Sequence, residues 1–257
     1  MKQKNLAMLL PPLLAIYSCT PFSNIEMQPE KGEVQESQNS SNNGEQQTAE
    51  DYRSLGDSAM HENPERSIKF FEKALELKPD DIISLYHMGE SYNLLQDYKK
   101  AEQIHKRAVA INPKNPDSWR HLAQTYDECF RFDDAAECWR KVIDLALGGD
   151  EESDRLIRDL YEISAKEYGS GTHIFLVQSL KKGGRIADAL AAADEGMAKT
   201  NDPLLYVIRA DIFTDLGRYE EALKDYETLM KQNPIIWELN KSTIQSLEDK
   251  LKSTSGK

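Results

Sequence analysis

The feature that most constrains this chain is a period of 34 residues that runs through most of its length. Residues 82–115 and 116–149 carry small residues, a tyrosine and an alanine at the same offsets. These are Gly89 and Ala123, Tyr92 and Tyr126, and Ala101 and Ala135. A unit this short cannot bury its own apolar face, so copies of it must stack on one another. The period therefore predicts a repeat array.

These offsets resemble the tetratricopeptide repeat, with its small residue and tyrosine in a first helix and its alanine, aromatic and proline in a second. The resemblance implies an all-α fold, a right-handed superhelical solenoid of stacked antiparallel helix pairs whose first helices line a concave surface. Small side chains allow the paired helices to approach closely. Pro79, Pro113 and Pro234 are expected to end second helices.

We expect the solenoid to span residues 49–252. Its repeats are predicted at about 49–81, 82–115, 116–149, 170–202 and 203–236. Residues 150–168 do not fit the period and predict an inserted helix, followed by a loop at Gly169-Ser170-Gly171. A cap helix is predicted at 237–252, because the last repeat of an array needs a polar cover, and residues 253–257 are predicted to be a disordered tail.

The amino terminus predicts export and a lipid anchor. Residues 1–18 place Lys2 and Lys4 before an apolar run that is shorter than the ~18–20 residues of a membrane-spanning helix, which is typical of a signal peptide. The segment Ile16-Tyr17-Ser18-Cys19 resembles the lipobox of bacterial lipoproteins, which implies cleavage before Cys19 and acylation of its thiol. An ordinary secretory signal, with Cys19 incidental, is the alternative.

Residues 19–48 are rich in Gln, Ser, Asn and Glu and predict a disordered tether behind the lipidated cysteine. Thr20, where some bacteria use Asp to retain lipoproteins, predicts an outer-membrane anchor that faces the periplasm. The net charge of −12 argues against nucleic acid as a partner. A negative charge does not bind the protein to a membrane surface either, so the lipid is the only attachment to the membrane that we expect.

No motif predicts catalysis, so we expect a protein that is not an enzyme and binds no cofactor. Gly169-Ser170-Gly171 lacks the spacing of a nucleophile elbow, and His61-Glu62 lacks a second histidine one turn on. His87 and His121 lie one repeat apart on first helices, ~10 Å from each other, which favours solvated groove histidines over a metal site. Cys129 and Cys138 could form a disulfide or remain as buried thiols.

Binding is therefore expected at the non-core positions of the first helices. These are Arg53, Asp57, Met60, Tyr86, Glu90, Asn93, Arg120, Gln124, Asp127, Gln178, Lys181, Val207, Asp211 and Thr214. Acids predominate there and predict a preference for a partner segment that carries Lys or Arg, with apolar contacts at Met60, Tyr86 and Val207. The alternative is that these acids are only a solvated face.

The function predicted is a membrane-anchored scaffold or adaptor in the bacterial cell envelope, which binds another protein through its concave surface. The alternative is an accessory subunit of an envelope transporter that holds a small molecule. The two differ in what they require, since a small-molecule holder needs an apolar pocket and an adaptor needs an open polar groove.

Overall fold

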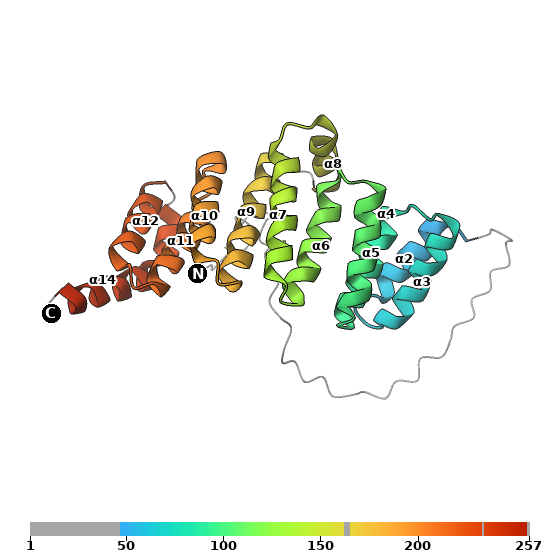
Figure 1. The fold of residues 1–257 in the computed structure, drawn as a ribbon, viewed down its shortest axis with the longest axis horizontal. Coiled ribbons are helices and arrows are strands. Elements are labelled where there is room, and N and C mark those ends of the chain that lie inside the picture. The colour runs from blue at the N-terminus through green and yellow to red at the C-terminus, as the bar shows by residue number, and fades with distance from the viewer. Residues whose placement is uncertain (1–46, 162–164, 233, 256–257) are drawn as a thin grey trace, which may run out of the picture. The chain divides into compact units, whose positions relative to one another are not determined.

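A computed structural model describes residues 47–161, 165–232 and 234–255 of the 257-residue chain. The predicted signal peptide, Cys19 and nearly all of the predicted tether lie outside the described residues. Within the described ranges the regular elements are all helices, so the predicted all-α fold is confirmed (Figure 1). None of the helices in these ranges is long and apolar enough to cross a membrane.

Ten of the helices form antiparallel pairs that follow one another along the chain (Figure 1). The pairs are α2 (Ala49–Ala59) with α3 (Pro64–Leu77), α4 (Ile82–Leu94) with α5 (Tyr98–Ile111), α6 (Pro116–Glu128) with α7 (Phe132–Leu147), α9 (Ala165–Lys182) with α10 (Ile186–Thr200), and α11 (Pro203–Asp215) with α12 (Tyr219–Gln232). Three further helices are α8 (Glu151–Tyr161), α13 (Pro234–Leu239) and α14 (Lys241–Ser255).

Local sequence sets where many of these helices begin. Asp81 and Asp97 precede α4 and α5, and their carboxylates accept a hydrogen bond from a backbone N–H in the first turn of the helix. Asn115 does the same for α6. Such caps satisfy donors that have no partner within the helix, and each contributes about 1 kcal/mol. The turns between helices are therefore fixed locally, before any packing is considered.

Small residues let paired helices touch. A Cβ atom built on Gly56 would lie 2.4 Å from Cε1 of Phe71, and one built on Gly89 would lie 2.1 Å from Nε2 of His105. The space that each glycine leaves is filled by a ring from the second helix, and both rings are fully buried. Trp139 and Tyr226 are also buried at this offset of their own second helices. The close approach predicted from the pattern is confirmed at these glycines.

The stack curves toward its first helices. The first helix α2 contacts α4, α4 contacts α6, and α9 contacts α11, whereas successive second helices make at most marginal contact within the described residues. Because the helices are closer together on one side, that side lies on the inside of the curve. The first helices therefore line the concave face.

Three details differ from the prediction. Gly169-Ser170-Gly171 is not a loop but part of α9, where the missing side chain of Gly169 makes room for Leu147; an added Cβ atom would lie 2.7 Å from Cδ2 of that leucine. The inserted helix ends at Tyr161, and α9 begins at Ala165. The cap is divided into α13 and α14, and α14 continues to Ser255, into the segment predicted as a tail.

Candidate functional site on the concave face

Polar side chains connect the first helices across the concave face. Each pair joins one first helix to the next first helix along the stack, and we call the set the concave ladder. Its members are Asp57 with His87, Glu90 with His121, Asn93 with Thr125, Asp127 with Ser179, and Lys181 with Asp215. Five of the fourteen residues predicted to face a partner, Asp57, Glu90, Asn93, Asp127 and Lys181, are therefore already engaged with a neighbouring first helix.

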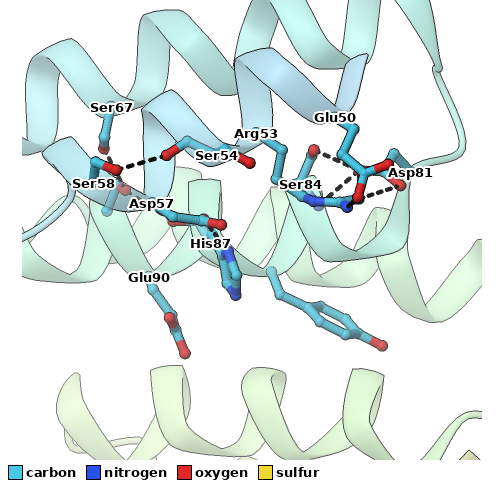
Figure 2. A network of polar contacts seen from close by, with 12 residues as sticks. Glu50, Arg53, Ser54, Asp57, Ser58, Ser67, Asp81, Ser84, His87 and Glu90 are labelled. Atoms are coloured by element: carbon cyan, nitrogen blue, oxygen red, sulfur yellow. Dashed lines mark hydrogen bonds and ion pairs between the residues drawn. The ribbon is translucent and has the colours of Figure 1, made fainter. Parts of the chain in front are cut away.

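The amino-terminal end of the ladder lies between α2 and α4. Figure 2 shows the carboxylate of Asp57 and the ring of His87 pointing toward one another, with Oδ1 and Nδ1 2.5 Å apart. Arg53 lies between Glu50 and the buried Asp81, at 3.2 and 3.1 Å (Figure 2). Burial alone would raise the pKa of Asp81, but hydrogen bonds from Ser84, Lys78 and Arg53 outweigh it and lower that pKa. Arg53 therefore positions α4 against α2, and little of its charge is left for a partner.

A buried charged cluster, the α6 cluster, consists of Glu90, Asp117, Arg120 and His121. Nε of Arg120 lies 2.5 Å from Oδ1 of Asp117. The ring of His121 lies between two acids, with Nδ1 3.2 Å from Oε1 of Glu90 and Nε2 3.5 Å from Oδ2 of Asp117. Asp117 and His121 are both only 4% exposed. These contacts hold α6 to α4 through groups that are buried, at Asp117 and His121, or half-buried, at Glu90 and Arg120.

Burial and pairing oppose one another in the α6 cluster. Burial disfavours the charged form of Glu90, yet the hydrogen bond and charge of His121 lower its pKa to about 2. Burial likewise opposes ionisation of Asp117, but Arg120 and His121 hold its pKa well below the usual range. Burial and Arg120 act to lower the pKa of His121, and the two acids reverse this and raise it. Pairing with neighbouring groups therefore outweighs burial at all three residues and favours their charged forms.

Two predictions about this region are wrong. His121 is not a solvated histidine, since its ring stacks on Tyr86 with the ring centroids 4.4 Å apart. Tyr86 does not offer an apolar contact to a partner, because it is buried and its hydroxyl is 2.8 Å from that of Ser118 and accepts a hydrogen bond from Asn115. Both residues stabilise the stacking of α6 on α4.

The sequence analysis missed His105. It occupies the offset at which Phe71, Trp139 and Tyr226 stand in other pairs, and that mismatch was the available signal. Nδ1 of the ring lies 2.8 Å from Oγ1 of Thr125, and Nε2 lies 3.3 Å from the carbonyl oxygen of Tyr86. Burial lowers the pKa of His105 to about 3, so the ring is neutral in the folded protein at neutral pH.

Three carboxylates of the concave face form no ion pair within the described residues, namely those of Asp127, Glu128 and Asp211. Burial raises the pKa of Asp127, although the hydroxyl of Ser179 and the indole N–H of Trp139 donate to it at 2.7 and 2.8 Å. Partial desolvation, together with Glu90 and Asp127, raises the pKa of Glu128. Desolvation also raises the pKa of Asp211, which is exposed. The unpaired acids of the face therefore lie from the end of α6 to α11, whereas Glu90 and Asp117 are paired with Arg120 and His121 inside the α6 cluster.

Some of the other predicted residues contact the protein itself, and others stay exposed. Met60 is the half-buried C-cap of α2, and Gln124 accepts a hydrogen bond from Arg120. Val207 packs against the core between α11 and α12, and the hydroxyl of Thr214 donates to the carbonyl oxygen of Ala210. Gln178 is exposed. Of the predicted residues, Asp57, Gln178 and Asp211 are exposed, and Asp57 is paired with His87.

The described residues contain no group of three or more side chains that could hold a metal ion. The thiols of Cys129 and Cys138 are both free, so the disulfide left open by the sequence is absent from the described structure. Burial raises the pKa of Cys138 to about 12, and the thiol therefore stays protonated and unreactive at neutral pH. Neither cysteine contributes a charge to the concave face.

Comparison with protein families matches three segments to models of the tetratricopeptide repeat, at residues 62–81, 93–146 and 176–235. A TPR repeat-containing protein of Methanocaldococcus jannaschii is 24% identical over 184 residues, which cover 71% of this chain and 28% of that protein. The photosystem I assembly protein Ycf3 of Prochlorococcus marinus is 28% identical over 100 residues, which cover 32% of this chain and 58% of that protein. The matched segments thus span less than two thirds of either relative.

Solved structures share the fold at low sequence identity. MamA from Desulfovibrio magneticus has a TM-score of 0.53 at 12% identity, with 71% of this chain and 93% of that chain covered. PilF of Pseudomonas aeruginosa has a TM-score of 0.53 at 17% identity, with coverages of 80% and 87%. YrrB, described as a TPR protein with an unusual peptide-binding site, has a TM-score of 0.50 at 17% identity, with coverages of 76% and 92%.

Proposed function

The chain is built from tetratricopeptide repeats, and on this basis we propose that it is a non-catalytic adaptor that binds a partner protein through the carboxyl-terminal half of its concave face. The observation that carries the proposal is the uneven charge of that face. Asp127, Glu128 and Asp211 form no ion pair within the described residues, whereas the acids near the amino-terminal end are paired with histidine or arginine.

The partner segment that fits this surface carries Lys or Arg. An extended or helical segment along the first helices would place its cations near Glu128 and Asp211, and Gln178 would offer hydrogen bonds to its backbone. YrrB, which shares the fold, is described as having a peptide-binding site, which supports a peptide segment as the ligand. A holder of small molecules, the alternative, would need an apolar pocket on a face whose accessible residues are polar.

Charge neutralisation tests the site. We expect Glu128→Gln combined with Asp211→Asn to weaken binding of a protein captured from cell-envelope extract by about 2- to 30-fold in dilute salt, because exposed pairs each contribute ~0.2–1 kcal/mol. The difference should largely disappear at high salt, where exposed charges are screened. Surface plasmon resonance at two ionic strengths measures both effects.

The matched control is Glu137→Gln with Glu227→Gln, two exposed acids on the second helices α7 and α12. It changes the net charge by the same amount but leaves the concave face intact. If both double variants weakened binding equally, the effect would come from the net charge of the protein, and the concave face would not be the binding site. An affinity that neither variant nor salt changes would have the same consequence.

We further propose that the adaptor is held at the bacterial outer membrane, facing the periplasm, by an acylated Cys19. The basis is the sequence alone, namely the short apolar run after Lys2 and Lys4 and the small residue Ser18 before the cysteine. Two or more acyl chains suffice for stable anchoring, at ~0.8 kcal/mol for each buried methylene. The tether would then let the repeats reach partners away from the lipid surface.

Cys19→Ala tests the anchor. We expect the native protein to incorporate radioactive palmitate and to enter the detergent phase in a phase-separation assay, and the variant to do neither. Circular dichroism should be the same for both, because the anchor is chemically separate from the repeats. If the variant is still labelled, or the native protein stays in the aqueous phase, Cys19 belongs to an ordinary signal and the adaptor is not lipidated.

A further inference from the structure

A shallow pocket opens on the side of the stack opposite the concave face. It has a volume of about 320 Å³ and is lined by Glu72, Leu75 and Glu76 of α3, Met88 of α4, and Ile104 and Arg107 of α5. The second helices α3 and α5 make at most marginal contact with one another, so a space remains between them. Met88 of the first helix α4 lies at the inner end of that space. The pocket is thus a place where the core of the first two pairs reaches the surface.

The floor of the pocket is apolar and firmly held. Leu75 and Met88 are 8% and 7% exposed and belong to the core cluster around Phe71 and Leu85, and Ile104 packs against the same cluster. These side chains cannot withdraw from the opening without disturbing the core. An aliphatic group that enters the pocket would therefore meet a preformed surface.

The rim of the pocket carries negative charge on the α3 side and positive charge on the α5 side. Glu72 and Glu76 lie one helical turn apart on α3, both exposed, and within the described residues neither forms an ion pair. Arg107 stands on the α5 side, where it donates to the carbonyl oxygen of Pro79 at 2.5 Å. The pocket therefore attracts a cation toward α3 and repels one from α5, which gives a bound side chain a direction.

We propose that this pocket is a second interaction site, which takes a basic amphipathic helix of a partner protein. A lysine of that helix lays its aliphatic stem on Leu75, Met88 and Ile104 and places its ammonium between Glu72 and Glu76. Lysine suits this arrangement because its long stem is apolar and only its end is charged. The volume lies at the small end of ligand sites, so it accepts one or two side chains rather than a cofactor.

The site is independent of the proposed concave site, since it lies on second helices and its acids are different ones. The chain would then hold two segments at once, one on each side of the stack. Linking two such contacts raises the overall affinity without strengthening either one. This arrangement would suit a protein that brings partners together.

The test uses the full-length protein and a fluorescein-labelled helical peptide made of leucine and lysine, with a leucine and glutamate peptide as the comparison. Fluorescence anisotropy at low salt should show binding of the lysine peptide only. We expect Glu72→Lys combined with Glu76→Lys to weaken binding at least tenfold. The methyl signals of Met88 and Ile104 should shift when the peptide is added to protein labelled with carbon-13 at these methyl groups.

The control is Glu137→Lys with Glu227→Lys, which changes the net charge equally on other exposed second-helix positions. It should change the affinity less than threefold. Equal losses in the two Lys variants, or unshifted methyl signals at Met88 and Ile104, would overturn the pocket. The concave-face adaptor would still stand in that case, because its own variants are scored separately.

Discussion

Asp117→Asn should lower the free energy of unfolding by about 3–5 kcal/mol, because it removes the negative charge that compensates Arg120 and His121 inside the fold. Asparagine keeps the shape of the side chain, so the loss reports on charge and not on packing. Both ionic partners of Asp117 are largely shielded from water, and neither can regain full hydration while α6 stays docked. Urea denaturation followed by circular dichroism measures the loss.

Asp133→Asn provides the matched control. Asp133 also pairs with an arginine, Arg185, at 3.0 Å, but its side chain is 78% exposed. Exposed pairs of this kind contribute ~0–1 kcal/mol, so little stability should be lost. Comparable losses for Asp117→Asn and Asp133→Asn would mean that the α6 cluster does not hold the fold.

A double variant separates the charge imbalance from the contact itself. Arg120→Leu added to Asp117→Asn removes the uncompensated cation and should recover part of the lost stability, since replacing a buried ion pair by apolar groups is often nearly neutral. If the double variant is less stable by the sum of the two single losses, the two side chains act independently, and the account of balanced charges fails.

His105→Phe should make the stability of the protein less sensitive to pH below neutrality. The unfolded chain takes up a proton at His105 near pH 6.5, but the folded chain takes it up only near pH 3, where burial has placed the pKa. Between these values the unfolded state binds more protons, so stability falls as the pH falls. For one proton the slope is about 1.4 kcal/mol per pH unit.

Phenylalanine is the appropriate replacement because the chain already uses it. Phe71 fills the same slot against Gly56 that His105 fills against Gly89. Free energies of unfolding measured at pH 6.5, 5.5 and 4.5 should fall less steeply with falling pH in the variant. The difference in slope should be up to about 1.4 kcal/mol per pH unit, the value for one proton. Glu90, with a pKa of about 2, and the other carboxylates are the same in both proteins, so the difference between the two slopes reports on position 105.

His121 adds a contribution of opposite sign. The acids around it raise its pKa above the unfolded value, so the stability it supplies is present below pH 6.5 and is lost as the pH rises through the folded pKa. The His105→Phe variant keeps this loss above pH 6.5. Parallel curves for the two proteins between pH 6.5 and 4.5 would show that His105 is not held neutral in the fold.

The repeat pattern by itself determined the helix pairs and their slots, because these depend on residues close together in the sequence. Capping residues such as Asp81 and Asp97 start helices through backbone hydrogen bonds in the adjoining turn. Gly56 and Gly89 mark where a ring from the next helix must fit, since a side chain of any size would collide with it. Both signals depend on residues that are close together in the chain, so they can be recognised in a single sequence.

Only the tertiary structure decided which of the first-helix side chains are open to a partner. Tyr86 and His121 occupy positions that the period assigns to the surface, yet they are buried, because the curvature of the stack brings α4 and α6 together on the inner side. The acids of the face are indistinguishable in the sequence. Glu90 is neutralised and Asp211 is not, because an imidazole from another helix reaches only the first.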